Sequence, residues 1–410
     1  MVGWGLYRLG INLYGVLLRA ISPFHKKANK FVKGRKNWEA NLALKLESAE
    51  KVIWMHCSSL GEFEQGRPIF EGLMNEKPNY TYLLTFFSPS GYEPRQNYQK
   101  AIVQYLPLDK KSSAQKFIEL TNPSLAIFVK YEFWPNYLLA LDQRGIPTFL
   151  VSGIFRSNHY LFSSRGAWMR QHLHSFNHIF CQDKNSVLLL KSKGINKVSV
   201  AGDSRFDQVL SLVNEERSLD KVSLFKSNKK LLVLGSTWPI DEDIFSNLNF
   251  EGWKVVVAPH NVSKNRIEEI EDSFKHMKSC RYSTATGDEL KECQLLILDG
   301  IGLLKYIYRY ANLSYIGGGF GVGIHNTLEA AAYGSPILFG PKYHKFLEAI
   351  DLLNIGAART ISGREGLEQI WSELGQDYKK LNEMGSKAEE HVRSSTGASQ
   401  TMIKGLLASL

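Results

Sequence analysis

One acidic residue follows an apolar run at a position suited to a general base. The segment Ser58-Ser59-Leu60-Gly61-Glu62 comes after the apolar residues 52–57 and before a helix expected from about Glu64. Gly61 permits a turn that residues with a Cβ resist, and Glu62 would lie at or just before the helix N-terminus. Backbone N–H groups there favour the ionised carboxylate, which can accept a proton. The same placement also stabilises a helix with no further role, so this loop alone leaves both interpretations open.

Two further polar loops follow apolar runs in the first half of the chain. Phe87-Ser88-Pro89-Ser90-Gly91 offers hydroxyls and backbone donors, although turn chemistry alone accounts for it. Glu132 lies in Lys130-Tyr131-Glu132-Phe133-Trp134-Pro135-Asn136. A carboxylate among aromatic side chains needs a hydrogen-bond or cationic partner, which favours a site role for Glu132.

Loops of small residues recur in the second half. Gly235-Ser236-Thr237, Pro259-His260-Asn261, Asp299-Gly300-Ile301-Gly302 and the glycine run 317–323 each open onto an expected helix. Helix N-termini preceded by small residues bind anions, so these loops suit a nucleotide phosphate. No G-K-[ST] occurs, and Val322 stands where G-x-G-x-x-G would need Gly. A P-loop nucleoside triphosphatase and an ordinary dinucleotide dehydrogenase are therefore both disfavoured.

The glycine run continues into Ile324-His325-Asn326-Thr327-Leu328-Glu329. Asn326 can cap the next helix and Glu329 can complete a capping box. Alternatively, Asn326 contacts phosphate and Glu329 contacts ribose hydroxyls at the mouth of a cleft. The combination of glycines, His, Asn and Glu on one loop favours this second interpretation.

The elements that position these loops are apolar, β-branched strands alternating with helices. The first series of predicted strands comprises 52–57, 82–87, 102–106, 125–129, 148–151, 178–181 and 198–201, and the second comprises 231–234, 254–258, 294–298, 313–316 and 336–339. Continuous rather than alternating hydrophobicity is typical of a parallel sheet covered by helices on both faces. In such α/β sheets ligands bind beyond the carboxyl ends of the strands, where the loops above lie.

The length of 410 residues favours two or three domains. Residues 209–229 are polar and lack a strong apolar period, which predicts two Rossmann-like domains, 39–215 and 216–390, facing each other across a cleft. Residues 1–38 form a separate basic segment, and the helix at 391–410 is expected to pack back on the first domain.

The net charge of +10 is concentrated at the N-terminus. No acid precedes Glu39, whereas the basic residues there are Arg8, Arg19, Lys26, Lys27, Lys30, Lys33, Arg35 and Lys36. At 100° per residue, a narrow polar face of an expected helix carries Gly5, Arg8, Asn12, Gly15, Arg19 and Ser22. This pattern predicts an amphipathic helix in the bilayer interface, with residues 1–36 on an anionic membrane surface. The alternative is a helix packed on the protein's own core with a solvated basic tail.

Other classes are disfavoured by composition. A 44% hydrophobic and 22% charged chain is globular, and no uncharged apolar stretch reaches ~18 residues, which excludes a polytopic membrane protein. Cys57, Cys181, Cys280 and Cys293 show neither a disulfide framework nor zinc-ligand spacing, which fits a reducing cytosol. Nucleic-acid binding is disfavoured because no second basic stripe with interleaved aromatic residues occurs.

The loops together resemble the 3-deoxy-D-manno-octulosonic acid (Kdo) transferases of lipopolysaccharide biosynthesis, glycosyltransferases of the GT-B fold. The family's motifs occur in order through most of the chain, as Ser59-Leu60-Gly61-Glu62, Ser88-Pro89-Ser90-Gly91, Glu132-Phe133-Trp134-Pro135-Asn136, Arg144-Gly145-Ile146-Pro147, Gly202-Asp203-Ser204-Arg205-Phe206-Asp207, Gly235-Ser236-Thr237, Pro259-His260-Asn261 and Gly323-Ile324-His325-Asn326-Thr327-Leu328-Glu329. Of these motifs, W-P-N and H-N-x-L-E are the most specific to the family.

Four positions depart from the family pattern. His260 stands where the family usually has Arg, which implies a weaker or pH-dependent donor contact. Leu303 replaces an acid after Gly302, so that only a backbone contact to the cytidine is implied there. Thr327 replaces a helix-start Pro, and Arg205 replaces Lys with its charge kept.

The resemblance implies an inverting transfer of Kdo from CMP-Kdo to a hydroxyl of the lipid A precursor (lipid IVA), with Glu62 as catalytic base and neither cofactor nor metal. The implied acceptor-side residues are Ser59, Gly61, Ser88, Ser90, Gly91, Glu132 and Arg205. The implied CMP-binding residues are Ser236, Thr237, Pro259, His260, Gly302, Leu303, His325, Asn326, Thr327, Leu328 and Glu329. The implied location is the cytoplasmic face of the bacterial inner membrane, as a peripheral or monotopic protein.

Two alternatives stay open. Another GT-B enzyme, such as a nucleotide-sugar 2-epimerase, would need a uracil-type donor and no lipid surface. A non-catalytic peripheral membrane protein would not need the intact S-L-G-E and H-N-T-L-E loops.

Overall fold

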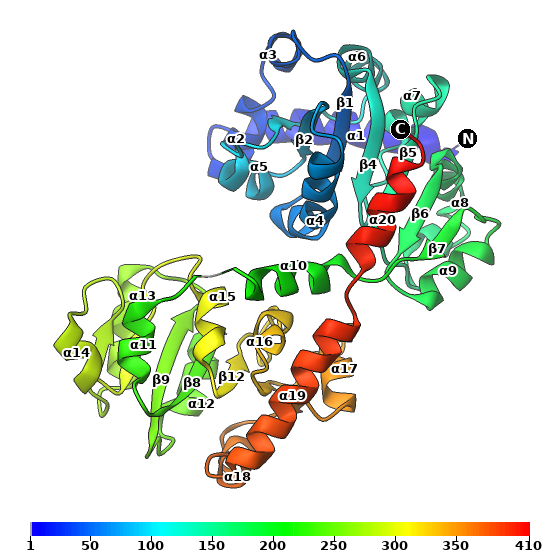
Figure 1. Ribbon diagram of the computed structural model, residues 1–410. Coiled ribbons are helices and arrows are strands. Elements are labelled where there is room, and N and C mark those ends of the chain that lie inside the picture. The colour runs from blue at the N-terminus through cyan, green and yellow to red at the C-terminus, as the bar shows by residue number, and fades with distance from the viewer. Residues whose placement is uncertain (1, 216) are drawn as a thin grey trace. The chain divides into compact units, whose positions relative to one another are not determined.

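The computed structural model describes residues 2–215 and 217–410, and divides the chain into two compact units (Figure 1). Unit 1 comprises Met1–Gln208 with Thr396–Leu410, and unit 2 comprises Val209–Ser395. Each unit contains one seven-stranded sheet in which the paired strands are parallel. The division falls inside helix α10 (Ser204–Val213), so the boundary predicted at residue 215 lies within unit 2. The helix is continuous across this division, because Phe206, Val209 and Leu212 form a buried apolar stripe along it.

Unit 1 is built on a sheet with the strand order β3-β2-β1-β4-β5-β6-β7. Its strands are β1 (Val52–Cys57), β2 (Thr81–Phe86), β3 (Ile102–Tyr105), β4 (Pro123–Val129), β5 (Thr148–Gly153), β6 (His178–Cys181) and β7 (Val198–Val200). Its helices are α1 (Val2–Ile21), α2 (Lys26–Lys33), α3 (Trp38–Lys45), α4 (Leu60–Glu76), α5 (Pro89–Arg95), α6 (Lys111–Thr121), α7 (Pro135–Gln143), α8 (Ala167–Arg170), α9 (Lys184–Lys191) and α20 (Ala398–Leu407), with 3₁₀-helices η1 (Tyr160–Phe162) and η2 (Gln171–Ser175).

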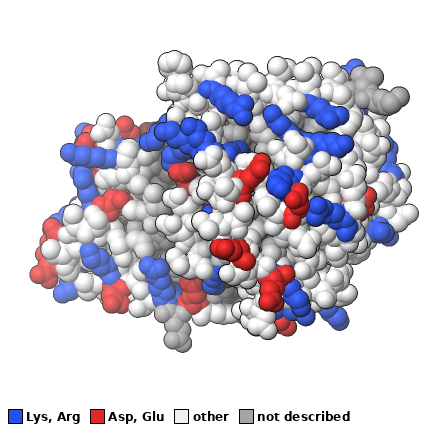
Figure 2. All heavy atoms as spheres, turned by 90° about the horizontal axis from the view of Figure 1, so that it is seen from above, with Lys and Arg blue, Asp and Glu red and all other residues white. Residues whose placement is uncertain are grey.

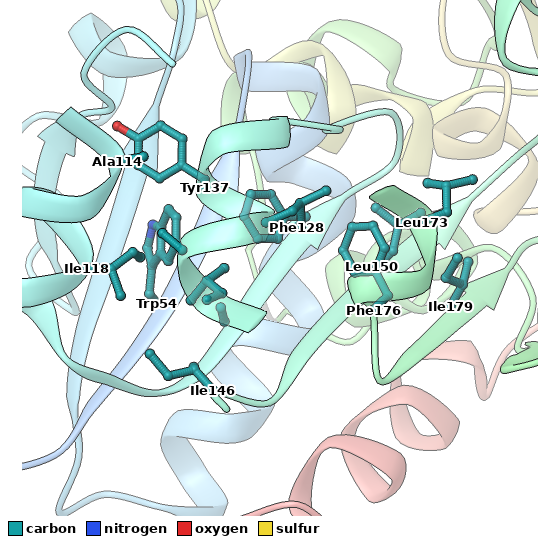
Figure 3. Packing of buried hydrophobic residues seen from close by; sticks show 14 of the residues in the cluster. Trp54, Ala114, Ile118, Phe128, Tyr137, Ile146, Leu150, Leu173, Phe176 and Ile179 are labelled. Atoms are coloured by element: carbon teal, nitrogen blue, oxygen red, sulfur yellow. The ribbon is translucent and has the colours of Figure 1, made fainter. Parts of the chain in front are cut away.

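The two faces of this sheet carry separate hydrophobic cores because successive side chains of a strand point to opposite faces. Along β1, Trp54 packs with residues of α6 and α7, whereas Met55 packs with residues of α4 and α20. Figure 3 shows Trp54, Ile118 and Tyr137 pointing toward one another from β1, α6 and α7. All six residues of β1 are buried, which explains the unbroken apolar run in the sequence.

Unit 2 repeats the architecture with the strand order β10-β11-β9-β8-β12-β13-β14. Its strands are β8 (Lys230–Thr237), β9 (Trp253–Pro259), β10 (Ser279–Arg281), β11 (Leu295–Ile297), β12 (Leu313–Ile316), β13 (Ile337–Phe339) and β14 (Ala358–Thr360). Its helices are α11 (Asp220–Lys226), α12 (Pro239–Ser246), α13 (Lys264–Ser273), α14 (Gly287–Glu292), α15 (Leu304–Ile307), α16 (Leu328–Ala332), α17 (Leu347–Asn354), α18 (Arg364–Leu374) and α19 (Tyr378–Ser394), with the 3₁₀-helix η3 (Tyr308–Tyr310). The twelve predicted strands are confirmed, while the short strands β10 and β14 were not predicted.

The C-terminal helix α20 packs on unit 1. Met402, Ile403 and Leu406 are buried in the core that α4 also covers, and a Cβ at Gly72 of α4 would lie 2.3 Å from Ile403 Cδ1. The carboxylate of Asp207 accepts hydrogen bonds from the backbone N–H groups of Gly397 and Ser399, at 2.6 and 2.7 Å. These bonds hold the start of α20 against unit 1.

Helix α1 packs on unit 1 along one side only. Tyr7 donates a hydrogen bond to Asp109 at 2.7 Å, and the Trp4 ring lies 5.1 Å from that of His172. Gly15, predicted on the polar face, is instead buried against Leu108. Within residues 2–215 and 217–410, none of the helices has the length and apolar character needed to cross a bilayer.

Two of the eight N-terminal cations have partners within unit 1. The Arg35 guanidinium donates to the carbonyls of Leu106 and Phe87, at 2.8 and 2.7 Å, and lies 3.6 Å from the centre of the Phe31 ring. Lys30 pairs with Glu93. The basic segment 1–38 is thus integrated into unit 1.

The structure also corrects the expectation that the cysteines carry no disulfide. It pairs Cys280 of β10 with Cys293, which directly precedes β11. The pairing arises because β10 and β11 are neighbours in the sheet, an arrangement that a spacing of 13 residues does not reveal. Cys57 and Cys181 are buried and free.

Candidate active site

Three loops predicted to carry chemistry meet at the carboxyl end of the unit 1 sheet. They follow β1, β2 and β4, which are adjacent and parallel, so their carboxyl ends share one edge. Ser88 donates its backbone N–H to the carbonyl of Ser58 at 2.8 Å, which joins the first two loops. The Ser58 side chain lies close enough to the Glu132 carboxylate to help lower its pKa, which brings the first and third loops together.

Glu62 lies in the first turn of α4, half-buried and two residues after the start of the helix. Ser59 is the N-cap residue, and its hydroxyl donates to the Glu62 carboxylate. The helix begins at Leu60 rather than near Glu64, so Gly61 is helical and does not make the predicted turn. The nearest atom to a Cβ at Gly61 would be Ser59 Oγ at 3.8 Å, so its missing side chain leaves the space beside Glu62 open.

Glu132 is 7% exposed, and it has the partners that a carboxylate among aromatic residues requires. Its Oε2 accepts a hydrogen bond from Trp134 Nε1 at 2.6 Å and lies 3.2 Å from His56 Nε2. Burial by itself would raise the pKa of Glu132, but the contacts with His56, Ser58 and Trp134 outweigh it and hold that pKa below its ordinary value. Sequence reasoning missed His56, which is hidden in the apolar run of β1.

The other acceptor-side residues lie in the same part of unit 1. Ser88 caps α5 and accepts from Ser90 N and Ser90 Oγ, at 3.3 and 3.0 Å, which is the turn chemistry expected of this loop. A Cβ at Gly91 would lie 2.3 Å from the Phe86 ring, so glycine is required there. Arg205 forms an ion pair with Asp203 at 2.6 Å. The neighbouring Ser204 donates to the carbonyl of Gln65 in α4 at 2.6 Å, which places the start of α10 beside the Glu62 helix.

Strained backbone marks the strand ends of both units. Lys130 (φ 69°) follows β4, and Ser152 (φ 54°) and Ser236 (φ 55°) lie near the ends of β5 and β8. Non-glycine residues in this region cost about 1–3 kcal/mol each and persist where the surrounding structure holds them. All three lie at the edges where α/β sheets bind ligands.

In unit 2, the first predicted donor loop is held by two acids that sequence reasoning missed. Thr237 donates its hydroxyl to Glu242 at 2.6 Å, and Glu242 is paired with Arg266. The buried carboxylate of Asp241 accepts from the N–H groups of Trp238 and Gly318, both at 2.9 Å. Asp241 therefore ties the loop after β8 to the glycine run after β12.

The glycine run lies directly against the loop after β8. A Cβ at Gly317 would lie 2.3 Å from the carbonyl oxygen of Ser236, and one at Gly318 would lie 2.4 Å from that of Gly323. Gly318 also has a φ of 91°. Glycine is thus required here by close backbone packing rather than by a dinucleotide-binding pattern.

We expect Gly317→Ala to lower the free energy of unfolding of unit 2 by about 1–3 kcal/mol, because the Ser236 backbone must shift to admit the methyl group. Urea denaturation measures this change. Gly321→Ala is the matched control, since its Cβ would have no neighbour closer than 3.7 Å. Equal stability of the two variants would show that the run is not packed as described.

His260 and His325 form an aromatic stack with Trp238. The ring centres of Trp238 and His260, and of His260 and His325, are each 4.8 Å apart. Trp238 Nε1 donates to His325 Nε2 at 3.3 Å, so that nitrogen is an acceptor. Burial, reinforced by the neighbouring His260, lowers the pKa of His325, which favours its neutral form at neutral pH.

The remaining predicted donor residues lie at the starts of two short helices of unit 2 and at the end of β9. Asn326 donates to Glu329 at 3.1 Å and accepts from the N–H of Leu328 at 3.1 Å, but the N-cap residue of α16 is Thr327, so Asn326 is not the predicted cap; it is exposed. Thr327 and Leu328 are buried, and the Thr327 hydroxyl has no hydrogen-bond partner. Gly302 (φ 88°) precedes Leu303, the N-cap residue of α15, and that helix packs on Gly235. Pro259 ends β9 and is buried.

The described residues form no cluster of three or more His, Cys, Asp or Glu side chains suited to a metal ion.

The two Rossmann-like units define the GT-B fold, which solved structures share over most of this chain. UDP-GlcNAc 2-epimerase from Neisseria meningitidis matches 87% of the chain and all of its own, with a TM-score of 0.63 and 14% identity. MurG from Acinetobacter baumannii matches 87% of the chain and 99% of its own, with a TM-score of 0.57 and 13% identity. At these identities the likeness concerns the fold alone.

The sequence relatives of the chain are Kdo transferases. Residues 35–208 match the model of the family described as 3-deoxy-D-manno-octulosonic-acid transferase (kdotransferase). The 3-deoxy-D-manno-octulosonic acid transferase of Rickettsia typhi is 27% identical over 83% of this chain and 76% of its own, and that of Chlamydia muridarum is 25% identical over 80% and 79%. The chain is therefore similar to Kdo transferases over most of its length and is a glycosyltransferase.

Proposed function

We propose that the protein transfers Kdo from CMP-Kdo to a hydroxyl of the lipid A precursor, lipid IVA, with inversion at the anomeric carbon. The observation that carries the proposal is the meeting of Ser59, Glu62, Ser88 and Glu132 in loops at one sheet edge of a chain similar to Kdo transferases.

In this proposal Glu62 is the general base. Its carboxylate takes the proton of the acceptor hydroxyl while the hydroxyl oxygen bonds to the anomeric carbon of Kdo. The bond from that carbon to the CMP phosphate oxygen breaks on the opposite face, and its electron pair leaves with CMP. The hydroxyl of Ser59 orients the base, because it donates to the Glu62 carboxylate.

Unit 2 holds CMP in this proposal. Ser236 and Thr237 bind the donor phosphate through a loop that Glu242 and Asp241 fix in place. His260, stacked between Trp238 and His325, takes the place of the family's usual Arg. Asn326 and Glu329 bind the phosphate and ribose, Pro259 and Leu328 shape the site, and Gly302 and Leu303 contact the cytidine through their backbone.

Helix α1 is proposed as the membrane contact, on the cytoplasmic face of the bacterial inner membrane. The side of α1 facing away from unit 1 exposes the apolar residues Leu6, Leu9, Leu13, Val16 and Leu17, each 56–64% exposed. Phe24, which follows the helix, is 90% exposed, and the nearby residues Lys26, Lys27, Lys33 and Lys36 are exposed as well. Figure 2 shows Lys and Arg side chains among uncharged atoms along the upper edge of its view. An apolar face flanked by cations suits an interfacial helix on anionic lipid.

We expect CMP to raise the melting temperature of the protein and UDP to leave it unchanged. A ligand at 100 times its Kd stabilises the folded state by about 2.7 kcal/mol, which is readily measured by differential scanning fluorimetry. Stabilisation by UDP alone would favour a nucleotide-sugar 2-epimerase or another GT-B enzyme instead. No response to either nucleotide would favour a non-catalytic membrane protein.

The reaction itself is tested by incubating the protein with CMP-Kdo and lipid IVA and weighing the lipid product by mass spectrometry. The expected product is heavier by one or more Kdo residues. If the mass of lipid IVA does not change under conditions in which CMP binds, the proposed acceptor is wrong.

A further inference from the structure

His56 is a titratable side chain that the proposed mechanism does not use, although it lies in the centre of the acceptor-side loops. It is fully buried in β1, one residue before Cys57 at the end of the strand. The rings of Phe128 and Trp134 lie 6.0 and 5.9 Å from its ring, both edge to face. A polar ring in such surroundings needs partners for both of its nitrogens.

Both ring nitrogens of His56 have a polar neighbour. Nδ1 lies 2.9 Å from the Thr85 hydroxyl, and Nε2 lies 3.2 Å from Oε2 of Glu132. The contact with Glu132 falls outside the angles of a good hydrogen bond, so its attraction is mainly electrostatic. An unprotonated Nε2 would turn a lone pair toward a carboxylate and repel it, so the geometry requires a proton on Nε2.

The contact with Thr85 allows the His56 ring to be neutral or positively charged while Nε2 keeps its proton. Its hydroxyl oxygen accepts from Trp54 Nε1 at 2.8 Å. Its own proton can point to the Met55 carbonyl, at 3.4 Å, and then His56 Nδ1 donates to Thr85 as well. If the proton points to Nδ1 instead, the ring is neutral. Nε2 keeps its proton in both cases.

We propose that His56 is a positioning residue that keeps Glu132 ionised and fixed, and that Glu132 in turn fixes, through Ser58, the turn that leads into the helix of Glu62. The Ser58 side chain contacts the Glu132 carboxylate, and α4 begins two residues later, with Glu62 in its first turn. The proposal rests on the proposed function only for its kinetic assay.

Few other titratable groups face this pair. Glu62 and Glu64 from α4 lie close enough to raise the pKa of the Cys57 thiol, although burial contributes most to that shift. Tyr137 of α7 reaches the pair only through Trp54, whose ring is 5.9 Å from its own. Lys130 borders the pair along the chain after β4 and has contacts of its own. The nearest acids would repel Glu132, so the N–H at His56 Nε2 is the favourable partner that the geometry provides.

His56→Gln is the informative variant, because glutamine is uncharged and can still present an N–H to Glu132. We expect kcat/KM for Kdo transfer to fall about ten- to a hundred-fold at neutral pH, as for the loss of an electrostatic contact with a buried charged group. We expect the acidic limb of the pH profile to move to higher pH, because without His56 burial favours protonated Glu132. Raising the pH should therefore restore part of the activity. A uniform loss at all pH values, with an unshifted profile, would overturn the proposal.

Thr85→Val serves if His56→Gln does not fold, since valine keeps the shape of threonine and removes the hydroxyl that contacts His56 Nδ1, along with the acceptor for Trp54 Nε1. The same shift of the acidic limb is expected, in smaller measure. Glu132→Gln combined with His56→Gln should be no worse than Glu132→Gln alone, because the histidine then has no carboxylate to hold. Additive losses in the double variant would contradict the coupling.

Heteronuclear NMR of the histidine ring nitrogens tests the proton on Nε2 in the wild-type protein without substrate. A protonated Nε2 of His56 at neutral pH is expected. An unprotonated Nε2 would overturn the inference whatever reaction the protein catalyses, whereas absence of Kdo transfer with a protonated Nε2 would contradict only the proposed function.

Discussion

Replacing Glu62 by Gln is expected to lower kcat for Kdo transfer by about 10²- to 10⁴-fold, the range associated with removal of a general base. Glutamine has nearly the shape of glutamate and can accept the hydrogen bond that Ser59 donates, but it cannot take the acceptor proton. The first turn of α4 should remain intact, because Ser59 still precedes it. The measurement is the initial rate of product formation by mass spectrometry at saturating CMP-Kdo and lipid IVA.

Glu76→Gln is the matched control for this experiment. Glu76 ends the same helix, is exposed, and lies at the opposite end from the candidate base. It should retain wild-type kcat, and both variants should keep the wild-type melting temperature and the response to CMP. Near-normal kcat in a folded Glu62→Gln variant would remove Glu62 from the proposed role.

The second large effect concerns the exposed side of α1. Simultaneous Leu9→Gln, Leu13→Gln and Leu17→Gln changes are expected to weaken binding to anionic phospholipid vesicles about 10²-fold or more. Each leucine is more than half exposed in the protein alone. Transfer of this exposed part of the side chain into lipid contributes about 1 kcal/mol or more to binding. Vesicle co-sedimentation measures the binding.

Leu44→Gln and Leu188→Gln, on α3 and α9, are the controls, because they remove equally exposed leucines elsewhere on unit 1. They should bind vesicles like the wild type. CMP binding and the melting temperature should also be unchanged in the triple variant, since its leucines lie on the side of α1 that faces away from unit 1. Undiminished vesicle binding of the triple variant would show that α1 is not the membrane contact. Deletion of residues 1–36 is a poorer test, because it also removes the half-buried Arg35, which donates to the carbonyls of Leu106 and Phe87.

The fold was largely predictable because its strands are buried on both faces. The six residues of β1 and the seven of β9 are all buried, and such strands read as unbroken apolar runs. The strands β10 and β14 escaped prediction because they have three residues each, and Arg281 and Arg359 within them carry charge. Helix α10 escaped because its apolar stripe is short and lies among polar residues.

The candidate site was predictable only in part. Glu62 and Glu132 could be recognised because each follows a strand, at the edge where α/β folds bind ligands. His56, Asp241 and Glu242 could not be recognised, because their importance lies in contacts with residues distant in sequence. Asp241, for example, accepts a hydrogen bond from Gly318, 77 positions away. No periodic pattern signals such a contact.

The sequence by itself determined the class of fold, the order of the loops and the resemblance to Kdo transferases, since hydrophobic runs, glycine turns and short motifs are local properties. Only the tertiary structure decided which N-terminal cations are exposed at the surface and which make contacts within unit 1. Arg35 and Lys30 read as surface cations but are taken up by carbonyls and by Glu93, whereas α1 packs on unit 1 and still exposes leucines. Only one side of a helix contacts its neighbour, so an apolar helix can cover one face and expose another. Packing alone decides which face is covered.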